Sequence, residues 1–92
     1  MTSARADTFD ESIHWCLSDQ VSLRDETFGA LAYHHGTRRL VFLKSRDLVD
    51  LVRRVGDFDS AGAALDELVA SDQRARYASA LASLRASGLL SA

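Results

Sequence analysis

The 92-residue sequence contains no proline, a single cysteine and no long apolar run. The one cysteine, Cys16, cannot form a disulfide within the chain, which fits a reducing compartment. No segment approaches the roughly 20 consecutive apolar residues that a transmembrane helix needs. The polar start, MTSARADTFDES, lacks the apolar stretch of a signal peptide. We therefore expect a cytoplasmic protein that does not associate with membranes.

The sequence also lacks an excess of positive charge. Its formal net charge is −2, so no net basic field attracts nucleic acid. A composition of 47% hydrophobic and 26% charged residues is that of a globular chain rather than a disordered one. We expect a flexible tail over residues 1–12 and one folded domain with a modest core over residues 13–92.

The signatures of catalysis and metal binding are missing as well. There is no P-loop and no Rossmann glycine pattern. His14, Cys16, His34 and His35 lack the paired spacing of zinc ligands, and adjacent residues of a strand point to opposite faces. No Cys–His motif surrounds Cys16, so we interpret it as a packing residue beside Trp15. We expect no enzymatic activity, no cofactor and no metal ion.

The first half of the chain has the period-two pattern of β-strands. Apolar and polar residues alternate over residues 21–26, and small and large residues alternate over residues 29–34. The turn residues HGT then lead into a third strand over residues 38–44. Residues 13–17 have the pattern of an extended segment. Together these patterns predict a small antiparallel sheet.

The second half of the chain changes to helical spacing. Ser45 and Ser60 are placed to cap two helices, Asp72 is placed to open a third, and Gly88 to end it. The predicted fold class is therefore α+β, with a three-stranded antiparallel sheet followed by three helices on one side of it.

The strand over residues 38–44 is unusual because it is apolar on both faces. Leu40 and Phe42 point one way while Val41 and Leu43 point the other, so we expect neither face to be solvated. One interpretation is that the third helix simply covers this strand. The other is that strand and helix frame a binding groove, with cations gathered around it: Arg38, Arg39, Lys44, Arg74, Arg76 and Arg85.

A longer motif carries a more specific signal. The run SLRDETFGALAYHHGTRRLVFLKS and the later run YASALASLRASGLL resemble the mycofactocin precursor-peptide chaperones, and the likeness covers roughly residues 13–90. The matching positions are Leu23, Arg24, Glu26, Phe28, Gly29, Ala30, Leu31, Tyr33, Gly36, Thr37, Arg38, Leu40, Phe42 and Leu43.

The resemblance implies a fold and a function. Such proteins are similar to the pyrroloquinoline-quinone biosynthesis chaperone and to the recognition elements of ribosomally made, modified peptides, with a winged helix-turn-helix fold. They are not catalytic. They bind the precursor peptide and present it to a radical S-adenosylmethionine (SAM) maturase, which decarboxylates and crosslinks the C-terminal Val-Tyr of the precursor. The leader is expected to add as a strand beside the third strand, in a groove walled by the third helix.

These implications give a predicted set of peptide contacts and leave two alternative functions. One is a structural subunit of the maturase, which would bind the maturase but no peptide. The other is a DNA-binding winged helix, because a fold does not determine a function. Gln73, Arg74 and Arg76 near the start of the third helix would then read the bases. The predicted peptide-binding residues are Arg38, Arg39, Leu40, Val41, Phe42 and Leu43 on the strand, with Arg74, Tyr77, Ala78 and Leu81 on the helix.

Overall fold

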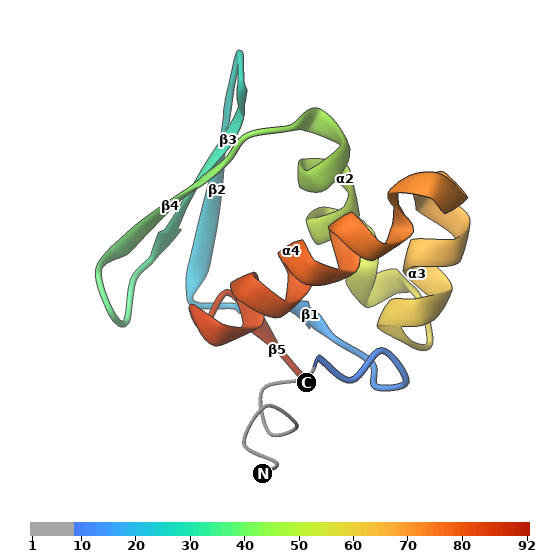
Figure 1. Cartoon of the computed structure of the whole chain (residues 1–92). Coiled ribbons are helices and arrows are strands. Elements are labelled where there is room, and N and C mark those ends of the chain that lie inside the picture. The colour runs from blue at the N-terminus through green and yellow to red at the C-terminus, as the bar shows by residue number, and fades with distance from the viewer. Residues whose placement is uncertain (1–8) are drawn as a thin grey trace, which may run out of the picture.

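A computed structural model describes residues 9–92 of the chain. It contains a three-stranded antiparallel sheet in the order β2-β3-β4, with three helices on one side of it (Figure 1). This arrangement confirms the predicted α+β class and is consistent with a winged helix-turn-helix. The elements are β1 (Cys16–Leu17), β2 (Val21–Glu26), β3 (Gly29–His34), β4 (Arg39–Leu43), α2 (Arg46–Arg54), η1 (Val55–Asp57), α3 (Ala61–Leu68), η2 (Ser71–Gln73), α4 (Arg74–Ala86) and β5 (Leu90–Ser91).

The turn between β2 and β3 requires a glycine. Gly29 has φ +149°, and a Cβ atom at this position would overlap the carbonyl oxygen of Leu43. A side chain here would therefore be strained twice, by the backbone conformation and by the close approach of the end of β4. This contact fixes the end of β4 against the start of β3.

Serine side chains begin the first two helices, as predicted. The Ser45 hydroxyl accepts a hydrogen bond from the Leu48 N–H at 3.0 Å, and the Ser60 hydroxyl accepts one from the Ala63 N–H at 3.1 Å. The predicted third helix is also present, but Asp72 does not open it. Asp72 lies within the 3₁₀ turn η2, and α4 begins at Arg74 without a side-chain cap.

The end of α4 follows the predicted pattern. Gly88 has φ +83°, and the Leu89 N–H donates back to the Leu84 carbonyl at 2.9 Å. Leu89 is fully buried, and Leu90 then pairs with Leu17 in the two-residue ladder of β1 and β5. The C-terminus is therefore tied to the segment that precedes the sheet.

The core lies between the inner face of the sheet and the helices. Ala30 and Ala32 supply the inner face of β3, and both are fully buried. Because alanine is small, α2 can approach the strand closely. The largest fully buried side chains are Leu43, Leu51, Val52, Val55, Leu65, Leu81 and Leu89.

The segment before β1 packs on the helices. The Phe9 ring stacks on Trp15 at a centroid distance of 5.4 Å. The carbonyls of Glu11 and Ile13 accept hydrogen bonds from the first two amides of α3, at 2.8 and 3.0 Å. Of the predicted tail over residues 1–12, residues 1–8 lie outside the described part of the chain, while residues 9–12 belong to this packed segment.

Candidate functional site

Among the described residues 9–92, β4 is an edge strand of the sheet, with β3 as its single neighbour. Two hydrogen bonds beside His34 show which way the peptide groups point. The His34 carbonyl accepts from the Arg38 N–H at 2.7 Å, and the His35 N–H donates to the Gln20 carbonyl at 2.7 Å. Successive residues of a central strand bond alternately to its two neighbours. His34, Ala32 and Ala30 therefore direct their peptide groups toward β4.

The register then identifies the peptide groups of β4 that face away from the sheet. Val41 pairs with Ala32 and Leu43 pairs with Ala30, so both direct their N–H and C=O groups toward β3. By the same alternation, Leu40 and Phe42 direct theirs away from the sheet. These two N–H and two C=O groups form an open backbone edge, which we call the β4 edge.

The side chains of β4 divide between two faces. Leu43 lies on the inner face and is 1% exposed, with Val41 half-buried beside it. Leu40 and Phe42 lie on the outer face and are 53% and 55% exposed. The expectation that neither face is solvated was therefore wrong, because all three helices cover the same side of the sheet.

α4 meets the chain just after β4. The Tyr77 hydroxyl lies 3.2 Å from the Ser45 hydroxyl, which also caps α2. Tyr77 and Ala78 are half-buried, whereas Leu81 is fully buried in the core. Of the four residues predicted on this helix, Tyr77 and Ala78 are thus partly exposed, whereas Leu81 is not accessible to a ligand.

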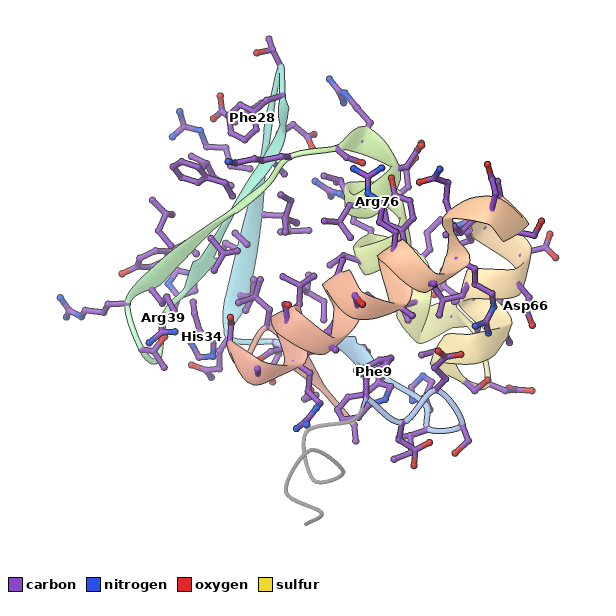
Figure 2. All side chains as sticks on the ribbon, viewed as in Figure 1. Phe9, Phe28, His34, Arg39, Asp66 and Arg76 are labelled. Atoms are coloured by element: carbon purple, nitrogen blue, oxygen red, sulfur yellow. The ribbon has the colours of Figure 1, made fainter. Side chains whose placement is uncertain are left out.

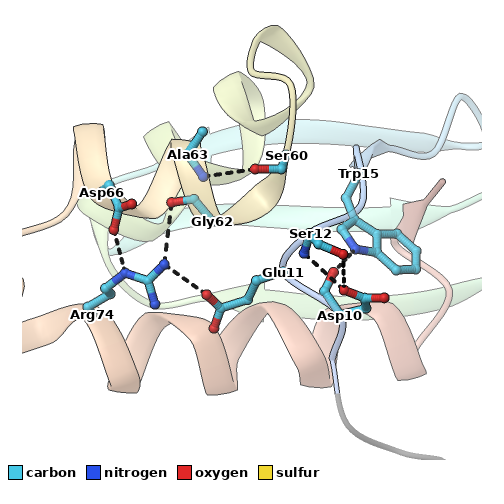
Figure 3. Close-up of polar contacts among 9 residues, drawn as sticks. All are labelled: Asp10, Glu11, Ser12, Trp15, Ser60, Gly62, Ala63, Asp66 and Arg74. Atoms are coloured by element: carbon cyan, nitrogen blue, oxygen red, sulfur yellow. Dashed lines mark hydrogen bonds and ion pairs between the residues drawn. The ribbon is translucent and has the colours of Figure 1, made fainter.

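Arg74 has a different environment from the other predicted contacts (Figure 3). Its guanidinium contacts Asp66 at 2.6 Å and Glu11 at 2.8 Å, and it donates to the Gly62 carbonyl at 3.4 Å. The hydrogen bonds that Arg74 donates to the carboxylates of Asp66 and then Glu11 raise the pKa of Arg74 above its usual value. The side chain therefore joins α4 to α3 and to the segment before β1.

The cations at the two ends of β4 differ from Arg74 in their ion pairing. Within residues 9–92, no carboxylate lies within 4.0 Å of Arg38, Arg39 or Lys44, and all three side chains are exposed. Residues 34–46 include no aspartate or glutamate. The β4 edge is thus locally positive in a chain whose net charge is −2.

The histidines have separate structural contacts. His14 Nε2 lies 2.8 Å from the Gly56 carbonyl, and His35 Nε2 lies 2.7 Å from the Ser22 hydroxyl. His34 Nδ1 accepts the amides of Gly36 and Thr37 in the β3–β4 turn, at 3.1 and 3.2 Å. In the described part of the chain, no three metal-ligating side chains converge, and no helix is long and apolar enough to cross a membrane.

Comparison with known proteins places the chain in a family. The model of the peptide chaperone MftB family matches residues 14–91. The chain belongs to this family. The match confirms the resemblance found in the sequence, and the family's named role, that of a chaperone, is not enzymatic.

Curated relatives carry the same name. The Peptide chaperone MftB of Mycolicibacterium smegmatis is 48% identical over 84 residues, which cover 90% of this chain and 82% of the relative. That of Mycobacterium ulcerans is 40% identical over 89 residues, covering 96% and 82%. That of Mycobacterium tuberculosis is 48% identical over 56 residues, covering 59% and 51%. No solved structure matches the chain.

One feature of the surface was missed in the sequence. Phe28, at the β2–β3 turn, is 42% exposed, and its ring lies 5.9 Å from that of Phe42. Strand alternation already placed Leu40 and Phe42 on one face. The sequence did not show that all three described helices lie on the opposite side of the sheet, because this depends on how the helices pack rather than on any local pattern.

Proposed function

We propose that the chain is a non-catalytic chaperone that binds a precursor peptide as an additional strand along the β4 edge and presents it to a radical SAM maturase in the cytoplasm. The observation that carries the proposal is the open edge at Leu40 and Phe42, in a member of a peptide chaperone family. Strand addition supplies backbone partners for such an edge, and the peptide's side chains supply specificity.

The energetics indicate what the peptide must contribute. Two N–H and two C=O groups offer four hydrogen bonds, each with a net value of about 0.5–1.5 kcal/mol. Ordering a flexible segment costs about 2–5 kcal/mol, so the backbone bonds roughly offset the ordering. The net affinity then comes from apolar side chains of the peptide. At about 25 cal/mol per Å², two or three buried aliphatic residues contribute several kcal/mol.

The side chains of an added strand would alternate between two environments. Those on the inner side would lie over Val41, Tyr77 and Ala78, which are half-buried. Those on the outer side would lie beside Leu40 and Phe42, which are exposed. Both environments are apolar, so the preferred peptide has an apolar residue at successive positions of the paired segment.

Charge complements this arrangement. Arg38, Arg39 and Lys44 lie at the two ends of β4 and are exposed. Acidic residues flanking the apolar segment of the leader would be attracted to them, which raises the association rate and fixes the register. The preferred ligand is therefore an extended apolar segment with carboxylates on either side.

The start of α4 favours a peptide over DNA as the ligand. Arg74 is held by Asp66 and Glu11, and Gln73 accepts a hydrogen bond from Arg76 at 3.2 Å. A helix that reads bases needs such side chains to reach the base edges. Here they contact neighbouring protein groups, two of which are carboxylates that would repel the phosphate backbone.

Proline substitution at the β4 edge tests this proposal. Leu40→Pro and Leu40→Ala both shorten the side chain, but only Leu40→Pro removes the outward N–H. By calorimetry with the precursor peptide, Leu40→Pro should bind about two- to ten-fold more weakly than Leu40→Ala, the equivalent of one net hydrogen bond. Equal affinities in two folded variants would contradict strand addition at this edge.

A further inference from the structure

The sheet has an exposed apolar face on the side opposite the helices. Because paired residues of neighbouring strands share a face, Leu31 lies beside Phe42 and Tyr33 lies beside Leu40. Phe28 joins this group through its contact with Phe42, and Figure 2 shows it on the side of the sheet away from the helices. We call this surface the outer face; its apolar residues are Phe28, Leu31, Tyr33, Leu40 and Phe42.

A peptide strand at the β4 edge does not cover the outer face. The peptide lies in the plane of the sheet next to β4, about 4.8 Å away, whereas Phe28, Leu31 and Tyr33 lie over β3 and the β2–β3 turn. Phe28, Leu40 and Phe42 are 42%, 53% and 55% exposed. Contiguous apolar surface of this kind, rich in aromatic residues, is typical of protein–protein contacts.

We propose that the outer face is the docking surface for the maturase, an inference that rests on the function proposed above. An added strand would place every second side chain on the same face as Leu40 and Phe42. The docked enzyme would then contact the chaperone and the bound leader together. The peptide completes the surface that the enzyme recognises, so each ligand increases the affinity for the other.

Charge indicates the chemistry of the partner surface. Arg24 lies on the outer face opposite Leu31, and its side chain is 79% exposed. Glu26 contacts its Nε atom at 2.9 Å, which leaves the two terminal amino groups of the guanidinium to bond a carboxylate of the partner. With Arg38 and Lys44 flanking β4, cations predominate around this face. The partner surface is therefore apolar at its centre and acidic at its rim.

The same charges disfavour a second copy of the chain as the occupant. A symmetric dimer brings the same surface of two subunits together. Two outer faces in contact would bring together two surfaces on which the cations Arg24, Arg38 and Lys44 outnumber the one acid, Glu26. A like net charge on the two sides of an interface reduces affinity. An acidic partner has no such conflict.

Two outer-face variants and a matched control test the inference. Phe28→Ser removes an exposed ring, and Arg24→Glu reverses an exposed charge; neither residue is on β4. The control is Ile13→Ser, which removes another exposed apolar side chain, 37% exposed, outside the sheet. Folding of each variant is checked by thermal melting. Binding of the purified maturase is then measured by calorimetry, with and without saturating precursor peptide.

We expect peptide to increase maturase affinity about ten-fold for the natural protein and for Ile13→Ser. Phe28→Ser and Arg24→Glu should bind the maturase at least ten-fold more weakly, while their affinity for the peptide changes less than two-fold. Natural maturase affinity in both variants would overturn the inference, as would a dimer of the natural protein that Phe28→Ser dissociates in sedimentation. If the natural protein binds no peptide, the function proposed above fails instead.

Discussion

The two edges of the sheet have opposite character. β2 ends in three consecutive charged residues, and Arg24 pairs with Glu26 at 2.9 Å while Asp25 pairs with Arg53 of α2 at 2.8 Å. β4 reads Arg-Leu-Val-Phe-Leu, with no acid and with cations at its ends. Charged side chains along an edge strand discourage further pairing. One edge is therefore protected from additional strands, and the other is left available.

At β4, the requirements for solubility and for peptide binding conflict. An apolar edge beside an exposed apolar face is an aggregation hazard in a chain with no partner. The cations at the two ends of β4 reduce that hazard, because two copies of the edge repel each other. They also favour an acidic ligand, so the same charges serve both purposes.

The largest expected effect is a loss of stability. It distinguishes the β4 peptide groups that bond to β3 from those that face away from the sheet. Val41→Pro removes an N–H that bonds to β3 and leaves a carbonyl of β3 without its partner, which should cost about 3 kcal/mol. That loss lowers the melting temperature by more than about 10 °C in a domain of this size. Leu40→Pro should lower it by only a few degrees. Equal losses, measured by thermal circular dichroism, would mean that the assigned alternation along β4 is incorrect.

The next largest effect is expected when an acidic side chain, like those of β2, is placed on β4. Leu40→Glu places a carboxylate in the middle of the β4 edge, where it opposes both apolar burial and an acidic ligand. Losing the burial of one leucine costs about 1.5–3 kcal/mol, so peptide affinity should fall at least ten-fold. Leu40→Lys removes the same apolar contact without the repulsion. If the two variants bind equally well in calorimetry, the peptide is not acidic near this position.

A smaller effect tests the cations at the start of β4. In the double variant Arg38→Gln and Arg39→Gln, the fold should be unchanged, because both side chains are exposed and no described carboxylate contacts them. Peptide affinity at low salt should fall several-fold, mainly through a slower association rate. The difference from the natural protein should shrink as salt rises toward 1 M, where the screening length is about 3 Å. A salt-independent loss would indicate direct packing instead.

The smallest effect concerns Arg74, which the sequence placed among the peptide contacts. Its ion pairs with Glu11 and Asp66 lie at the surface, and such pairs contribute about 0–1 kcal/mol each. Arg74→Gln should therefore lower the melting temperature by a few degrees and change peptide affinity less than two-fold. A larger loss of affinity with an unchanged melting temperature would place Arg74 at the interface after all.

Much of the fold could be predicted because its signals are local. Period-two alternation gave the bounds of β2 and β3, and serines before apolar helical repeats gave the starts of α2 and α3. The start of α4 was misplaced because Asp72, a residue typical of caps, lies in a 3₁₀ turn instead. The pairing of β1 with β5 was missed, since two-residue strands carry no period.

The site was less predictable because it depends on contacts distant in sequence. The direction of the Leu40 and Phe42 peptide groups follows from hydrogen bonds around His34, which the sequence does not display. The exposure of their side chains depends on the helices all covering one side of the sheet. Arg74 is held partly by Glu11, a partner 63 residues earlier in the chain, and no periodicity connects the two.

Amide hydrogen exchange along β4 tests the central claim most directly. Without peptide, the Leu40 and Phe42 amides should exchange rapidly while the Val41 amide, bonded to β3, is protected. With saturating precursor peptide, the first two should become protected by at least an order of magnitude, and Val41 should change little. Protection of Leu40 and Phe42 before peptide is added, or its absence in the complex, would contradict an open edge that the peptide completes.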